Sequence, residues 1–267
     1  MMKTIYTCFP DGKHKVLTMS YDDGKLADRK LISIFNQYGI KGTFHINAGL
    51  FQDEKRIKPE EFLELYRGHE VSCHTYTHPT IARCPMEQVV RQVLEDREAL
   101  EKIMGYPVRG LSYPNGSYNK EIMEVLPKLG IRYSRVVGNT DNFAMPENYL
   151  EWKATCHHNH NLMELGQEFI NLHKTQYLYM MYVWGHSYEF DEKNNWNLIE
   201  DFCNLVSGKE DIWYATNIQI VDYMEAVKRL QFAADMSFVY NPSVQTVWLS
   251  VGKEIIEVTG GKQIKLG

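Results

Sequence analysis

The fold is set by the stretch KVLTMSYDDG at residues 15–24 and by the segment behind it. Residues 15–21 favour a β-strand, and residues 26–38 then carry Leu31, Ile34 and Phe35 at helical spacing before Gly39 ends the pattern. A strand followed directly by an amphipathic helix is the repeating unit of a parallel α/β sheet. The turn between the two elements holds adjacent carboxylates, Asp22 and Asp23.

The same alternation continues along the chain. Further strands are predicted at residues 42–47, 70–74, 108–114, 131–137, 149–156, 176–186 and 211–217, and helices at 59–67, 85–104, 119–129, 162–174, 195–207 and 218–230. The helix at 85–104 repeats apolar residues every three or four positions, so one of its faces should cover a sheet. Seven or eight strands with helical crossovers predict a parallel sheet closed into a barrel, with its active face at the C-terminal strand ends.

The domain organisation follows from length and from a change in pattern near the C-terminus. A chain of 267 residues is within the range of a single α/β barrel. We expect the barrel over residues 1–237. Residues 238–267 instead contain short β-type runs, TVWLSV and EIIEV, separated by glycines, which predicts a small β tail without catalytic residues.

Composition excludes several classes of partner. The net charge of -5, the pI near 6.1 and the lack of clustered Lys or Arg argue against nucleic acid or an anionic membrane as the partner and favour a small-molecule or oligosaccharide substrate. The first residues lack the apolar run of a signal peptide, and no segment reaches membrane-spanning length, so a cytoplasmic location is expected. Five scattered cysteines predict neither a disulfide framework nor a cysteine-based zinc site.

Two groups of polar residues follow predicted strands. Asp22 and Asp23 end the first strand, where one carboxylate can bind a metal and the other can take a proton from water. The simpler alternative is an Asp-Gly turn. His74 and His78 follow the third strand, and a spacing of four brings two imidazoles to one side of a turn. Two neutral imidazoles and one carboxylate leave coordination positions open, which is typical of a catalytic metal site.

Read in order, SYDDG (20–24), HTYTH (74–78), LSYPNG (111–116) and WGH (184–186) resemble the successive motifs of the polysaccharide deacetylases, the NodB homology family or carbohydrate esterase family 4. The resemblance implies a distorted (β/α)7 barrel. It also implies a divalent metal, usually zinc, with cobalt, nickel or manganese as alternatives, on Asp23, His74 and His78. Asp22 would be the general base and His186 the general acid.

The third motif departs from the family pattern. It implies that Asn115, with the neighbouring Tyr113, binds the oxyanion or the substrate. The family's base-orienting arginine is replaced by Ser112, which carries no charge. Arg135 is the candidate substitute, with Arg109 as a second and more structural one.

The family's fourth motif, an Asp-Trp pair, is not recognisable in this sequence. Asp141 and Trp152 are candidate replacements, although a turn and a core position describe them equally well. The chain also places His157, His158 and His160 after a predicted strand, and His45 and Asn47 after another. We expect at most a substrate contact from one of the three clustered histidines, with a second metal site as the alternative, and at most a substrate contact from His45 or Asn47. Glu189 can hydrogen-bond near the site, but an exposed loop residue is the simpler interpretation.

The residues thus predict a metal-dependent hydrolase of a C–N amide bond, most simply an N-deacetylase acting on an acetylated amino sugar or oligosaccharide. A second hypothesis keeps the barrel and changes the substrate, as in allantoinase-like and cyclic-imide hydrolases. A third is a catalytically inactive carbohydrate-binding protein.

Overall fold

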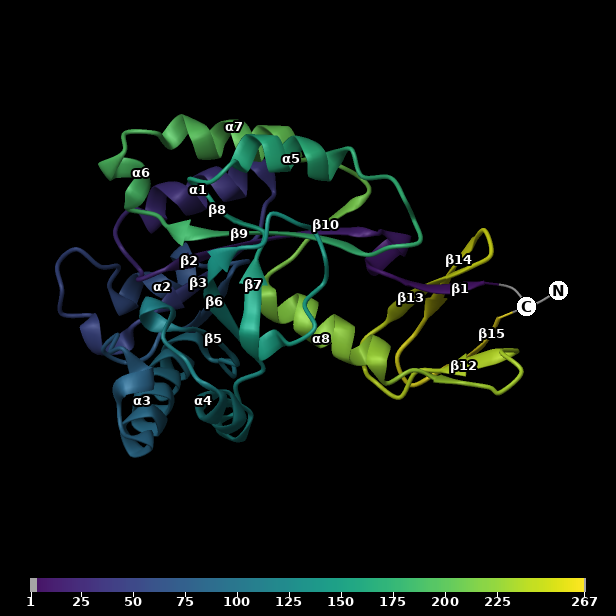
Figure 1. Ribbon diagram of the computed structural model, residues 1–267, viewed down its shortest axis with the longest axis horizontal. Coiled ribbons are helices and arrows are strands. Elements are labelled where there is room, and N and C mark those ends of the chain that lie inside the picture. The colour runs from purple at the N-terminus through teal and green to yellow at the C-terminus, as the bar shows by residue number, and fades with distance from the viewer. Residues whose placement is uncertain (1–3, 267) are drawn as a thin grey trace.

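The computed structural model describes residues 4–266 and shows parallel strands that alternate with helices (Figure 1). One sheet has the strand order β7-β6-β5-β4-β3-β2-β9-β8, and β10 pairs with β2. Its strands are β2 (Lys15–Asp22), β3 (Gly42–Ile46), β4 (Glu70–Cys73), β5 (Gly110–Ser112), β6 (Tyr133–Asn139), β7 (Trp152–Ala154), β8 (Cys156–His157), β9 (Tyr179–His186) and β10 (Ile212–Tyr214).

The sheet closes through the short strands at its two ends. β7 pairs with β6 and β8 pairs with β9, and only Thr155 separates β7 from β8. The single strand predicted at 149–156 is therefore two short strands, because the Thr155 side chain takes part in the pairing with β9: its hydroxyl donates to the carbonyl of Met180 at 3.3 Å and accepts the N–H of Tyr182 at 3.0 Å. The result is a distorted α/β barrel, as predicted.

The helices are α1 (Asp28–Tyr38), α2 (Phe62–Leu65), α3 (Met86–Met104), α4 (Lys120–Val125), α5 (Leu162–Ile170), α6 (Glu189–Glu192), α7 (Trp196–Val206) and α8 (Asn217–Lys228). In Figure 1, α1, α5 and α7 cover one side of the barrel, and α3 and α4 lie on the other. The buried face of α3 contains part of the predicted apolar stripe, Val89, Val93 and Leu100, whereas Leu94 is exposed; it also contains the fully buried carboxylate Asp96. That carboxylate reaches a loop of the candidate site.

The tail contains two small sheets. One has the order β1-β13-β14, built from Ile5–Cys8, Val247–Val251 and Glu254–Val258, and the other has the order β11-β12-β15, built from Gln231–Phe232, Phe238–Tyr240 and Gln263–Lys265. Although β1 and β11 precede residue 238, they pair with tail strands, so the division of the chain at residue 237 stays a prediction. The tail lies at the opposite end of the molecule from the C-terminal end of β9 (Figure 1). Within residues 4–266, no helix is both long and apolar enough to cross a membrane.

Candidate active site

The predicted metal ligands lie together at the C-terminal ends of the strands. Asp23 follows β2, and His74 and His78 follow β4. Ligand atoms of the three side chains all lie within 4.8 Å of one another, and the rings of His74 and His78 are 4.7 Å apart. Asp23 and His78 both have left-handed backbone conformations, with φ values of 81° and 59°. Such conformations are unfavourable for these residues and are common at functional sites.

The donors of this cluster fit a divalent cation. Nδ1 of His74 donates to the carbonyl oxygen of Ser112 at 2.9 Å, so the lone pair of the neutral ring is on Nε2. Burial lowers the pKa of His74 to about 4, which keeps the ring neutral at physiological pH. One carboxylate and two neutral imidazoles are a ligand set for zinc and similar ions, and they leave positions for water and substrate.

The predicted base, Asp22, is buried beside this cluster. Nη2 of Arg135 donates to its Oδ2, and the hydroxyl of Ser112 donates to its Oδ1 at 3.1 Å. Burial alone would raise the pKa of Asp22, but the charges of Arg135 and of nearby histidines outweigh it and hold that pKa well below its usual range. Arg135 also stacks on Trp184, with 4.3 Å between the guanidinium carbon and the ring centre.

Strand register explains why an arginine from elsewhere in the sequence occupies this position. Arg135 on β6 is paired with Ser112 on β5, so the two side chains reach Asp22 from neighbouring strands at the same level. The second candidate, Arg109, is bonded instead to Asp222 on α8 at 2.7 and 2.8 Å. Arg109 therefore connects helix and barrel and does not contact Asp22.

The predicted acid, His186, ends β9 and is paired in register with Asp22 on β2. Its Nδ1 lies 3.1 Å from Oε1 of Glu189, which begins α6 and is largely buried, so the interpretation of Glu189 as an exposed loop residue was wrong. Burial lowers the pKa of His186, but Glu189 and the charges of Asp22 and Asp23 outweigh that effect, and the net shift is upward. The only sequence signal was the spacing of three residues, which places His186 and Glu189 on one side of the turn that begins α6.

Neither candidate for the missing Asp-Trp motif contacts His186. Asp141 is on an exposed turn and lies 2.9 Å from Nε2 of His160. Trp152 is fully buried and packs edge-on against Tyr133 and Tyr182. Glu189 occupies the position beside the acid histidine instead.

Glu189 is shared with two further histidines. Nε2 of His157 lies 3.0 Å from its Oε2, and Nε2 of His158 lies 2.9 Å from the same oxygen. These three side chains form a second group with metal-ligand geometry. However, Nδ1 of His157 accepts the N–H of Asn159 at 3.1 Å, which places the proton of the neutral ring on Nε2, facing Glu189. That protonated nitrogen has no lone pair to offer a cation, which argues against a metal centre on this group.

The remaining sequence candidates lie at the edges of the site or in the core. Asn115 is in a turn with φ 56°, and its side chain donates to Thr80 at 3.2 Å. The Tyr113 side chain is buried in the hydrophobic core, and its hydroxyl donates to the carbonyl of Leu150 at 2.8 Å. His45 is buried next to Asp22 in the strand register.

The chain is therefore an α/β barrel whose Asp-His-His cluster forms a candidate cation site at the C-terminal ends of the strands. Residues 10–134 match the sequence model of the polysaccharide deacetylase family. A chitooligosaccharide deacetylase from Rhizobium leguminosarum bv. phaseoli is 28% identical over 123 residues, which are 46% of this chain and 48% of that protein. A peptidoglycan-N-acetylglucosamine deacetylase from Bacillus cereus is 30% identical over 121 residues, 43% of this chain and 40% of that protein. These matches show that residues 10–134 are similar to the polysaccharide deacetylase family, and they span less than half the length of either relative.

Solved structures extend the likeness to most of the barrel. A Mycobacterium smegmatis protein described as a polysaccharide deacetylase has a TM-score of 0.65 at 18% identity, over 85% of this chain and 95% of that one. A family 4 carbohydrate esterase from Streptomyces lividans, in complex with acetate, has a TM-score of 0.52 at 16% identity, over 75% and 91% of the two chains. A family 4 pseudoenzyme from Bacillus anthracis has a TM-score of 0.51 at 15% identity, over 81% and 68%. At these identities the likeness establishes the fold, and activity has to be argued from the site.

Proposed function

We propose that this chain is a metal-dependent hydrolase that removes the acetyl group from an N-acetylated amino sugar or oligosaccharide, with zinc as the metal. The observation that carries the proposal is the pairing of Asp22 with His186 across β2 and β9, next to the ligand cluster of Asp23, His74 and His78. A proton acceptor and a proton donor thus flank one cation site.

The residues divide the chemistry as follows. A bound divalent cation supplies Lewis acidity, which polarises an amide carbonyl and makes water easier to deprotonate. Asp22, held ionised by Arg135 and fixed by Ser112, accepts the proton of the attacking water. His186, whose pKa is raised, donates a proton to the departing nitrogen, and Glu189 fixes the ring that does so.

Two other functions make different demands on the same site. An allantoinase-like or cyclic-imide hydrolase would use the same base and cation on a cyclic substrate. A carbohydrate-binding protein without activity would not require acid, base and ligands together, and the presence of all five side chains in one place argues against it. The names of the deacetylase relatives favour the acetyl-sugar substrate.

A parallel substrate screen tests the proposal. Metal-loaded protein is incubated with N-acetylglucosamine oligosaccharides and, separately, with cyclic ureides. Acetate release from the sugars is expected, without ring opening of the ureides. Ring opening without acetate release would move the assignment to the second function, and inactivity on both with intact sugar binding would move it to the third.

A further inference from the structure

The loop after β3, residues 47–58, lies against both loops that carry the candidate ligands. Its Ile57 N–H donates to the carbonyl of Gly24, and its Gly49 N–H donates to the carbonyl of Tyr76, both at 2.9 Å. A side chain at Gly49 would lie 2.5 Å from that Tyr76 oxygen, so the contact requires glycine. This β3 loop therefore connects the Asp23 turn to the loop of His74 and His78.

Arg56 is the residue of this loop that meets Asp23. Its side chain is nearly fully buried, Nη1 donates to the main-chain carbonyl of Asp23, and Nη2 lies 3.8 Å from the Asp23 Oδ1. The same Nη1 donates to Oδ1 of Asn47 at 3.0 Å. Arg56 thus binds both the left-handed backbone of Asp23 and the amide of Asn47.

Asn47 continues the connection to the histidine loop. It is fully buried, and its Nδ2 donates to the carbonyl of His74 at 2.6 Å and to that of Thr75 at 2.9 Å. Thr75 has φ 64°, a conformation that is unfavourable for a β-branched residue unless its surroundings hold it. The two bonds from Asn47 hold the backbone in that conformation beside His74.

We propose that Arg56 and Asn47 form a positioning pair that fixes Asp23 and His74 relative to each other before a cation binds. The hydrogen bonds run without a break from Asp23 through Arg56 and Asn47 to His74 and Thr75, joining the ends of β2, β3 and β4. Neither residue binds the cation. The pair lowers the reorganisation needed when the ligands close on it. This inference rests on the proposed metal site.

Replacing Arg56 has two opposite expected effects on cation affinity, one from the lost charge and one from the lost positioning. The guanidinium is a fixed positive charge beside the site, so its loss alone would strengthen cation binding. Loss of positioning weakens it. Because Asn47 is uncharged, its truncation changes only the positioning.

The test measures cation affinity and uses no substrate. Apo protein, prepared with a chelator, is titrated with Co²⁺ and Zn²⁺ in competition with a chromophoric chelator. Arg56→Met and Asn47→Ala should each weaken binding about 10- to 100-fold. The double variant should bind the cation only slightly less tightly than the single variant with the lower affinity, because the two residues act through each other. The visible absorption of bound Co²⁺ should also change in both single variants, since it reports ligand geometry.

Arg109→Met is the matched control, because Arg109 is also paired with a carboxylate but lies on Asp222 and does not contact Asp22. It should keep wild-type affinity and the wild-type Co²⁺ spectrum. Affinity within about twofold of wild type in Asn47→Ala, or tighter binding in Arg56→Met, overturns the proposal. If Arg56→Met does not fold, the cation affinity and the Co²⁺ spectrum of Asn47→Ala are sufficient to test the positioning pair. Absence of cation binding in the wild-type protein would instead remove the proposed function.

Discussion

Each aspartate of the Asp22-Asp23 pair faces its own arginine. Arg135 binds Asp22, and Arg56 lies against Asp23. The two ion pairs balance in charge, and His74 is held neutral by burial. A cation therefore meets a free imidazole lone pair, with no proton to displace from His74. Single substitutions can separate the cation site from the proton-transfer groups.

Replacing His78 by Ala should remove the cation and leave the fold intact. His78 supplies one of three protein ligands from a partly exposed loop, so its truncation leaves two ligands and no buried cavity. Purified wild-type protein should contain about one divalent ion per chain by metal analysis. His160→Ala, a histidine paired with Asp141 on the rim, should keep that content. A fully loaded His78→Ala variant would refute the ligand assignment.

Replacing Glu189 by Gln should lower kcat by about tenfold or more and change its pH dependence. Glu189 raises the pKa of His186, so removing its charge lowers that pKa, and the protonated acid is lost at lower pH. The alkaline limb of the kcat–pH profile should therefore move to lower pH. Glu192→Gln, on the exposed side of the same helix, is the control. An unmoved limb would show that Glu189 does not act on the acid.

Between neighbouring strands, close packing determines which side chains reach the site. β8 lies beside β9, and the N–H of His158 donates to the carbonyl of Trp184 at 2.9 Å. The His158 ring stacks between Tyr21 and Phe190 and lies against Gly185. Glycine leaves the space that this ring needs beside Glu189.

Gly185→Ala should therefore destabilise the protein by about 1–3 kcal/mol in urea unfolding. An added Cβ would lie 2.1 Å from Nδ1 of His158, and either the ring or the strand has to move. Combining it with His158→Ala removes the clash, so the double variant should be less destabilised than the sum of the two single variants. Additive effects would mean that the ring and the added methyl group do not meet.

The sequence was sufficient to predict most strands and helices of the barrel and the residues that follow them, but not β1 or the division between β7 and β8. The strand before Asp22 and the histidines after the third strand depend on local pattern and spacing, which a sequence displays directly. Arg56 and Asp96 could not be found in that way. Asp96 accepts the N–H groups of Ala48 and His74 at 2.7 and 3.0 Å from within an amphipathic helix, and only packing brings it there.

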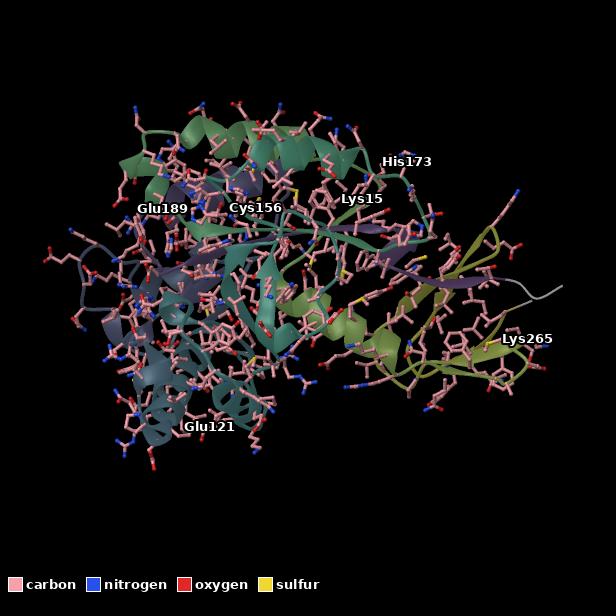
Figure 2. The ribbon with its side chains drawn as sticks, viewed as in Figure 1. Lys15, Glu121, Cys156, His173, Glu189 and Lys265 are labelled. Carbon is pink, nitrogen blue, oxygen red and sulfur yellow. The ribbon has the colours of Figure 1, made fainter. Side chains whose placement is uncertain are left out.

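The molecule as a whole separates its candidate chemistry from its tail. Glu189 lies at one end and Lys265, in the tail, at the other (Figure 2). The tail packs on α8 through Tyr223, whose hydroxyl donates to the carbonyl of Cys8 and accepts the N–H of Trp248. The tail therefore contributes none of the proposed catalytic groups. Global stability can be changed by groups far from the cation site.

His69 is such a group. Its Nδ1 accepts the N–H of Gly42 at 3.0 Å, and its Nε2 faces the Asn36 side chain at 3.1 Å, which requires a neutral ring. Burial lowers its pKa from 6.5 to about 4. The His69 ring therefore takes up a proton less readily in the folded protein than in the unfolded chain. Its contribution to the free energy of unfolding is complete above pH 6.5 and is lost as the pH falls towards 4.

His69→Gln isolates this contribution. The difference in unfolding free energy between wild type and variant should be constant at pH 7–8 and shrink by up to about 1.4 kcal/mol per pH unit from 6.5 to 4. Urea unfolding at each pH measures it. A difference that is independent of pH would show that His69 titrates alike in the folded and unfolded states.

Metal-dependent deacetylation with Asp22 as the base is tested most directly by measuring acetate release from an N-acetylglucosamine oligosaccharide. Three samples are compared: wild-type protein with zinc, wild-type protein after chelation, and Asp22→Asn with zinc. Only the first should be fully active. Chelation should abolish release, and Asp22→Asn should bind zinc normally while kcat falls by about 10² to 10⁴. Release that is unaffected by chelation, or near-normal turnover in zinc-loaded Asp22→Asn, would contradict a metal-dependent deacetylase with Asp22 as its base.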